Sequence, residues 1–179
     1  MSTLVDLNPI TLEVMLKLQA EVSGASYALY WQYNGEAGEV GTKSSYVTDA
    51  YRKELAAQGK TVSFAEASQS VAYSLEGNSP IAQVMRERQS IFIPDMTAVP
   101  DSSRSEVAKS YLIDGAAFVP VLGGVIEFGQ SHGVKQWSGA EDALRQVIPG
   151  EEVQKAFCDG GASYGIFWAR DVDKKVYIQ

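Results

Sequence analysis

The residue types that most often carry out catalysis are scarce in this sequence. It contains one histidine, His132, and one cysteine, Cys158. A single histidine gives no basis for a Ser-His-Asp triad, and a single cysteine excludes an internal disulfide and a multi-cysteine metal site. Cys158 has only Lys155 as a nearby cation to activate it, so we interpret it as a half-buried helix residue. We interpret His132 as an exposed loop residue, with haem ligation as the alternative.

Carboxylates are the next candidates for chemistry. Asp95, Asp101, Asp114 and Glu127 are scattered along the chain without the compact spacing of a metal site, so we expect no bound metal. Gly123-Gly124 is not a phosphate-binding loop, because no glycine-rich turn here opens a helix with a Lys-Ser/Thr pair. We therefore expect no catalytic residue and no cofactor.

Three arginines near the middle of the chain could bind an anion. They are Arg86, Arg88 and Arg104. The interpretation we favour is that they form ordinary surface ion pairs, for which the nearby acids are Glu87, Asp101 and Glu106.

Composition and charge narrow the class of protein. The chain has 179 residues and a net charge of −7, and 45% of its residues are hydrophobic, as in an ordinary globular protein. A net negative charge repels phosphate backbones, so we expect no nucleic-acid partner. No apolar run reaches the roughly 18 residues of a membrane span, and no signal peptide is visible. We expect a soluble intracellular protein of the cytoplasm or the plastid stroma, and a transit peptide removed earlier would leave no trace.

A helix and an aromatic strand are expected at the start. Asn8 and Pro9 suit the start of a helix over residues 9–22. Its apolar residues recur every four positions, so we expect the following stripe to face the core, or alternatively to pair with another copy: Ile10, Val14, Leu18 and Val22. A strand over residues 25–33 follows, and Asn34-Gly35 predicts a two-residue hairpin turn.

Shorter elements fill the middle of the chain. The pattern predicts helices over 50–57, 63–75, 81–88 and 106–112, a short strand over 89–93 and a turn-rich loop over 95–105. Two apolar runs, 116–122 and 125–128, flank Gly123-Gly124, which predicts a tight hairpin of two central strands. Ser138 and Glu141 form a capping-box pattern for a helix over 138–147.

A short internal repeat links the two ends of the chain. Residues 161–168, Gly-Ala-Ser-Tyr-Gly-Ile-Phe-Trp, match residues 24–31, Gly-Ala-Ser-Tyr-Ala-Leu-Tyr-Trp, at five of eight positions, with an offset of 161 − 24 = 137 residues. An offset of this size is a domain period. We interpret residues 1–147 as one domain and 148–179 as a helix and hairpin that resemble the start of a second copy. The alternative is that the tail completes the sheet of the first domain.

Several motifs occur in an order that carries a family resemblance. They are Ser-Pro-Ile-Ala-Gln-Val-Met at 79–85, Ile-Phe-Ile-Pro-Asp at 91–95, Ala116 with Phe-Val-Pro-Val at 118–121, and Gly-Val-Ile-Glu-Phe at 124–128. This ordered set resembles a GAF domain over about residues 11–147. The resemblance implies an α+β fold with a central antiparallel sheet flanked by helices and a concave pocket over one face.

The resemblance also implies which residues lie near that pocket. The expected set, walled by the 95–112 segment, is Tyr30, Phe92, Asp95, Arg104, Phe118 and Glu127. Whether the pocket is open or filled by side chains stays undecided. Bilin-binding GAF domains need a cysteine near a histidine, GAF-fold methionine sulfoxide reductases need two or more cysteines, and cyclic-nucleotide GAF domains carry an Asn-Lys-Phe-Asp-Glu signature. This chain departs from all three patterns.

Two further resemblances concern shorter stretches. The Tyr-Ala-Leu-Tyr-Trp strand at 27–31 is similar to the opening of the GAF-like amino-terminal domain of plant helix-loop-helix transcription factors. Residues 45–47 and 118–121 are similar to tandem-repeat proteins of algal plastids. Together these likenesses predict a non-enzymatic binding or interaction module, a docking unit of a larger assembly, with a protein partner or a homo-oligomer. The alternative is a small-molecule sensor domain.

Overall fold

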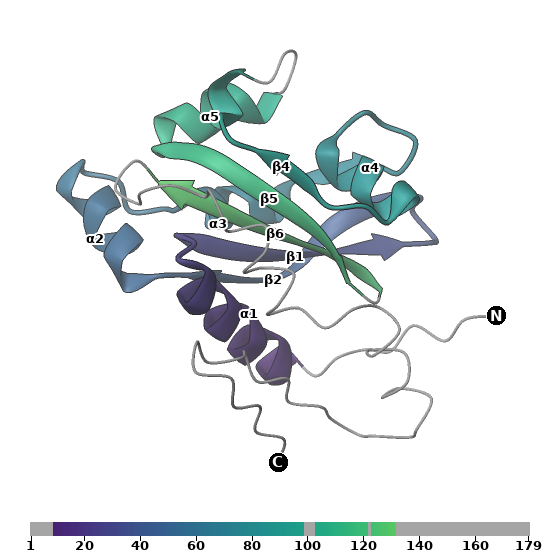
Figure 1. The fold of residues 1–179 in the computed structure, drawn as a ribbon, viewed down its shortest axis with the longest axis horizontal. Coiled ribbons are helices and arrows are strands. Elements are labelled where there is room, and N and C mark those ends of the chain that lie inside the picture. Colours follow the sequence, from purple (N-terminus) through teal and green to yellow (C-terminus); the bar gives the residue numbers. More distant parts are fainter. Residues whose placement is uncertain (1–8, 99–102, 122, 132–179) are drawn as a thin grey trace.

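The computed structural model describes residues 9–98, 103–121 and 123–131 of the chain. Its elements, shown in Figure 1, are α1 (Pro9–Ser23), β1 (Tyr27–Asn34), β2 (Glu39–Val47), α2 (Asp49–Ala57), α3 (Phe64–Ala67), η1 (Ser68–Ser70), β3 (Ala72–Ser74), α4 (Pro80–Glu87), β4 (Ile91–Ile93), η2 (Met96–Ala98), α5 (Ser103–Ser110), β5 (Ile113–Val121) and β6 (Gly124–Ser131). None of the described helices is long and apolar enough to cross a membrane.

Six strands form one sheet in the order β3-β2-β1-β6-β5-β4. Every neighbouring pair is antiparallel. The β5–β6 hairpin turns at Gly123, whose φ of 79° suits a residue without a Cβ atom. The predicted α+β fold with a central antiparallel sheet is confirmed, and so is the hairpin of two strands inside that sheet.

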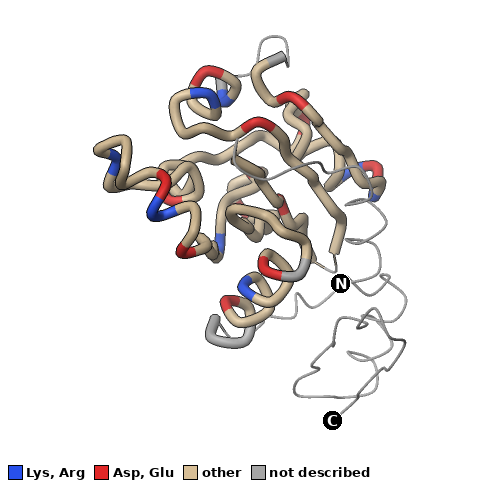
Figure 2. Tube along the Cα trace, turned by 60° about the vertical axis from the view of Figure 1, so that its left-hand side comes forward, with Lys and Arg blue, Asp and Glu red and all other residues tan. Residues whose placement is uncertain are grey.

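The two faces of the sheet carry different layers. Leu12, Leu16 and Ala20 of α1 pack against one face, and among the described helices Figure 1 shows α1 on that side. The helices α2 to α5 contribute side chains to the opposite cluster, together with Tyr27, Leu29 and Trp31 of β1. The charged residues of the strands are Glu39, Lys43, Asp114 and Glu127. Figure 2 shows further charged residues on the helices and turns.

The prediction for the buried stripe of α1 is wrong. Leu12, Leu16 and Ala20 face the sheet, whereas Val14 is 51% exposed and Leu18 is 40% exposed. Both stripes have a spacing of four residues, so periodicity alone does not choose between them. The selected stripe ends in Ala20, which is fully buried and whose small side chain permits close approach to the sheet.

Two other local predictions also fail. The predicted helix over 63–75 is one turn of helix, α3, followed by η1 and the edge strand β3. Ser63 and Glu66 form a capping box that starts α3, but the Ser68 hydroxyl donates to the Phe64 carbonyl and Ala72 pairs with Gly41 of β2. The turn after Asn34 has four residues before β2 begins, and it closes on Gly38, whose φ is 69°.

Several predicted features lie outside the described residues. They are the helix over 138–147, the repeat copy at 161–168, Asp101, His132 and Cys158.

We expect Gly129→Ala to destabilise the fold strongly. Gly129 of β6 pairs with Tyr27 of β1, and a Cβ atom at Gly129 would overlap the Tyr27 ring, which is fully buried. Overpacking of this kind costs about 1–3 kcal/mol or more in the free energy of unfolding, measured by urea denaturation. Gly41→Ala in β2 is the control, because nothing lies within 4 Å of its added Cβ atom. Equal losses for the two variants would contradict the packing of Tyr27 on Gly129.

Candidate functional site

A buried ion pair occupies the middle of the helix-covered sheet face. Glu127 lies on β6, one of the two central strands, and is 0% exposed. The Arg104 guanidinium reaches it from α5 with two parallel hydrogen bonds: Nη1 donates to Oε2 at 2.8 Å and Nη2 donates to Oε1 at 2.9 Å. This fork-to-fork geometry gives the strongest form of the arginine–carboxylate pair.

Two donors from β1 complete the surroundings of the carboxylate. The Tyr27 hydroxyl donates to Oε1 at 2.7 Å, and the Trp31 indole Nε1 donates to Oε2 at 2.9 Å. Residues four apart in a strand point to the same face, which is why both side chains meet one carboxylate. With four donors on two oxygens, the acceptor capacity of Glu127 is saturated.

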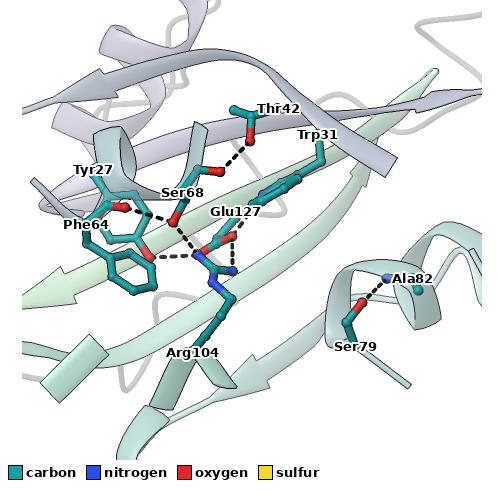
Figure 3. A network of polar contacts seen from close by, with 9 residues as sticks. All are labelled: Tyr27, Trp31, Thr42, Phe64, Ser68, Ser79, Ala82, Arg104 and Glu127. Atoms are coloured by element: carbon teal, nitrogen blue, oxygen red, sulfur yellow. Dashed lines mark hydrogen bonds and ion pairs between the residues drawn. The ribbon is translucent and has the colours of Figure 1, made fainter. Parts of the chain in front are cut away.

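A second layer holds Arg104 in place, as Figure 3 shows. Its Nη2 also donates to the Ser68 hydroxyl at 3.0 Å, and that hydroxyl donates to the Phe64 carbonyl at 2.8 Å. The guanidinium carbon lies 4.6 Å from the Phe64 ring centroid and 5.4 Å from that of Trp31. These contacts offset part of the cost of burying the guanidinium.

The local electrostatics agree with this geometry. Burial raises the pKa of the Tyr27 hydroxyl well above its usual value, and the neighbouring Glu127 carboxylate raises it further, while Arg104 opposes the shift. Burial alone would lower the pKa of Arg104, but Glu127 and Tyr27 more than offset this and raise it. Tyr27 is thus a neutral donor and Arg104 a permanent cation.

The six residues expected near a pocket are divided between three places. Arg104, Glu127 and Phe118 lie on the helix-covered face, with Arg104 and Glu127 in direct contact. Tyr30 and Phe92 belong to the cluster under α1, on the opposite face. Asp95 is exposed, and its carboxylate accepts hydrogen bonds from the backbone and side chain of Thr97.

The interpretation of the three arginines as surface ion pairs needs correction. Arg104 is buried against Glu127, a residue far away in the sequence. Arg86 donates to the carbonyls of Leu75 and Gly77. Arg88 donates to the carbonyls of Val121 and Gly124 and so ties α4 to the β5–β6 hairpin.

Sequence reasoning did not place Tyr27, Trp31 and Ser68 in the site. The signal for two of them was present in the repeat, because the tyrosine and the tryptophan recur at Tyr164 and Trp168 with the same spacing. Ser68 carried no such signal, since its partner depends on the tertiary position of α5.

The arrangement leaves the Glu127 carboxylate fully hydrogen-bonded. Every oxygen of Glu127 is already bonded, so it cannot act as a base or ligand without breaking the network. Within the described ranges, no group of three His, Cys, Asp or Glu side chains could hold a metal ion.

A pocket of about 320 Å³ lies elsewhere, at the end of β6. Its walls come from the end of α1, the start of α2 and the end of β6, and include Gly24, Ser26, Thr48, Glu54 and Ser131. The Ser131 hydroxyl donates to Glu54 at 2.7 Å and accepts from the Ser26 hydroxyl at 3.1 Å. The Ser26 and Ser131 hydroxyls and the Glu54 carboxylate are hydrogen-bonded to one another, so these three side chains do not need a ligand as a hydrogen-bond partner.

We expect Arg104→Met to cost about 3–5 kcal/mol in the free energy of unfolding, because it leaves the Glu127 charge buried without a counter-charge. The double variant Arg104→Met/Glu127→Met should lose less than the sum of the two single variants, measured in a urea double-mutant cycle. The control is Arg52→Met, which removes an ion pair to Glu66 whose side chains are 50% and 32% exposed. That loss should stay below about 1 kcal/mol. If the losses in unfolding free energy of the two single variants added up to the loss of the double variant, Arg104 and Glu127 would not be energetically coupled.

We also expect stability to fall as the pH rises above about 10. Burial raises the pKa values of Tyr27 and Tyr51 above 10.0. Below the tyrosine pKa of the unfolded chain both states are protonated, and above it only the unfolded chain ionises. Each such tyrosine therefore removes about 1.4 kcal/mol per pH unit until its own folded-state pKa is reached. Urea unfolding from about pH 9 to about pH 11 should show this decline, and Tyr51→Phe should make it shallower. If the free energy of unfolding declined with pH as steeply in Tyr51→Phe as in the wild type, Tyr51 would not contribute to the decline.

Comparisons with known proteins give a result for the fold only. No family model and no curated protein matches the sequence. Among solved structures, the chain is similar to a GAF domain/HD domain protein from Geobacter sulfurreducens, with a TM-score of 0.56, 11% identity, and coverage of 83% of this chain and 92% of that one.

Two further solved structures give similar values. The GAF domain of a two-component sensor histidine kinase from Bacillus halodurans has a TM-score of 0.55 and 11% identity over 85% of this chain and 94% of that one. Free methionine-R-sulfoxide reductase from Neisseria meningitidis, in complex with its substrate, has a TM-score of 0.53 and 14% identity. The match covers 83% of this chain and 78% of the reductase. At these identities the likeness concerns architecture, and it agrees with the ordered motifs: the chain has a GAF-like fold.

Proposed function

We propose that this chain is a non-enzymatic binding module that acts through contact with a protein partner or a second copy of itself. The observation that carries the proposal is the filled space over the helix-covered sheet face. Arg104 and Glu127 occupy it, with Tyr27, Trp31 and Phe64 packed around them. A ligand at that place would have to displace a saturated buried ion pair, which costs several kcal/mol.

The outer surface of α1 is where we expect the partner or the second copy to bind. Val14 and Leu18, four residues apart, form an exposed apolar stripe. Glu13, Lys17 and Glu21 are exposed on the same helix, so charges of both signs border the stripe, as the coloured turns of α1 in Figure 2 illustrate. An apolar stripe bordered by charges is typical of helices that pair with another helix.

The comparisons support a binding role in a general way. The similar domain from Bacillus halodurans belongs to a sensor histidine kinase, in which a domain of this fold serves a signalling protein. The similar reductase from Neisseria meningitidis is an enzyme. The GAF-fold reductases work with two or more cysteines, and the single Cys158 of this chain does not supply them. If the chain catalysed a reaction and Glu127→Gln or Asp95→Asn abolished that activity, the non-enzymatic assignment would be wrong.

A small-molecule sensor is the second candidate, and one observation favours it. The Tyr73 hydroxyl is buried and has no hydrogen-bond partner among the described residues. The Tyr73 ring packs on Trp31, with 5.6 Å between ring centroids, so it lies at the β3 side of the same sheet face. A small polar ligand there would satisfy the hydroxyl without displacing Arg104.

We expect the double variant Val14→Glu/Leu18→Glu to weaken self-association or partner binding by about tenfold or more, because it places charges on the apolar stripe. Its unfolding midpoint should stay near that of the wild type, since both side chains are already exposed. The measurements are light scattering after size exclusion and native mass spectrometry beside a denatured spectrum.

The matched control is Val62→Glu/Val107→Glu, which changes two other exposed valines, 44% and 39% exposed, outside α1. It should leave association unchanged. A bare dimer that the α1 variant converts to monomer supports the interaction module. A native mass above an integer multiple of 19.4 kDa, with the excess lost on denaturation, would instead favour the sensor.

A further inference from the structure

The pocket at the end of β6 has an apolar floor. Among its lining residues, Ala20 of α1 is fully buried, and Ala25 and Tyr51 are 3% and 1% exposed. The Tyr51 hydroxyl donates to the Tyr111 carbonyl, so the proton of that hydroxyl is not available to a ligand in the pocket. A volume of about 320 Å³ lies at the lower end of small-molecule pockets. The floor therefore suits a short alkyl chain.

Two glutamates line the same pocket. Glu54 of α2 is half-buried, and Glu21 in the last turn of α1 is exposed. One oxygen of each carboxylate is held by a hydroxyl, since Ser131 donates to Oε2 of Glu54 at 2.7 Å and Tyr46 donates to Oε1 of Glu21 at 3.0 Å. The second oxygen of each accepts no hydrogen bond from the part of the chain that the structure describes. Both carboxylates are thus positioned, and both keep an oxygen for a donor.

The charge of these two glutamates has no counter-charge at the pocket. Neither glutamate forms an ion pair with a described residue. The basic residues closest to them on their own helices that make no described ion pair are Lys17 and Lys53, which are exposed and do not line the pocket. The described lining contains no lysine, arginine or histidine. The pocket therefore carries a negative potential.

The two helix ends at the pocket do not cancel this potential. The last turn of α1 contains no basic residue, so the negative end of the helix dipole adds to the carboxylates. The start of α2 is the positive end of its helix, but it is already matched. The Thr48 hydroxyl accepts from the Tyr51 N–H, and Asp49 lies in the first turn.

We propose that this pocket binds an aliphatic primary amine in its ammonium form. The alkyl chain lies on the floor of Ala20, Ala25 and Tyr51, and the ammonium group lies against Glu54, with Glu21 at the rim. An ammonium group has three donors and no acceptor, which matches two carboxylate oxygens without donors. An anion would be repelled, and a neutral ligand would leave both charges unpaired. The site is separate from the apolar stripe of α1, and different variants test the two.

The first experiment is a titration of the full chain with n-butylammonium chloride at neutral pH and constant ionic strength, followed by the NMR shifts of the backbone amides. We expect saturable shifts at Gly24, Ser26 and Ser131, with a dissociation constant in the millimolar range, as suits so small a ligand. The neutral analogue 1-butanol should bind at least about tenfold more weakly. Equal binding of 1-butanol, or shifts that do not saturate at these residues, would overturn the proposal.

The second experiment repeats the titration with variants. Glu54→Gln should weaken binding by about tenfold or more, because the charge is lost while the amide oxygen can still accept from Ser131. Glu21→Gln, at the exposed rim, should weaken it several-fold and serves as a second test that leaves the floor intact. The control is Glu13→Gln, an exposed position of α1 that does not line the pocket. Urea unfolding should give all three variants the midpoint of the wild type. Wild-type affinity in both Glu54→Gln and Glu21→Gln would refute the site.

The third experiment identifies the source of the ammonium group, which is either a free amine or a lysine side chain of a protein. The probe is Nα-acetyl-lysine methylamide, whose side chain ends in the same butylammonium group. Tighter binding of this probe than of n-butylammonium supports a site for a partner's lysine, and weaker binding supports a site for a free amine. If neither probe shifts the amides of the pocket, the proposal is wrong.

Discussion

The carboxylate of Glu127, buried at the centre of the sheet, is the constraint on which the rest of the structure depends. A carboxylate without exposure to water is costly unless its charge and all its lone pairs are matched. The four donors that match it come from β1 and α5, and Arg104 is held in turn by the hydroxyl of Ser68, the first residue of η1. One acidic side chain thus sets the position of a strand, a helix and a connecting turn.

The same interaction determines how the fold can be used. Where a GAF-like fold can hold a ligand over its sheet, this chain places a saturated ion pair between Phe64 and Trp31. A ligand over this part of the sheet would have to break that ion pair, so the binding that we propose relies on other features. The exposed stripe of α1 and the buried hydroxyl of Tyr73 are the two features of the described residues on which our proposals of function rest.

Local patterns predicted the parts of the fold that local physics controls. The aromatic strand β1 and the turn at Gly123 agree with the structure. The choice between two stripes of α1 depends on how closely the helix can approach the sheet, which periodicity does not encode. Helix formation after Ala67 is overridden because β3 pairs with β2. Arg104 pairs with a residue 23 positions away in sequence, and a search for nearby acids cannot find such a partner.

A buried polar network also specifies strand register, which an apolar core does less strictly. A slip of one residue between β1 and β6 would turn Glu127 toward the apolar cluster of Leu12 and Leu16 under α1, away from its donors Tyr27, Trp31 and Arg104.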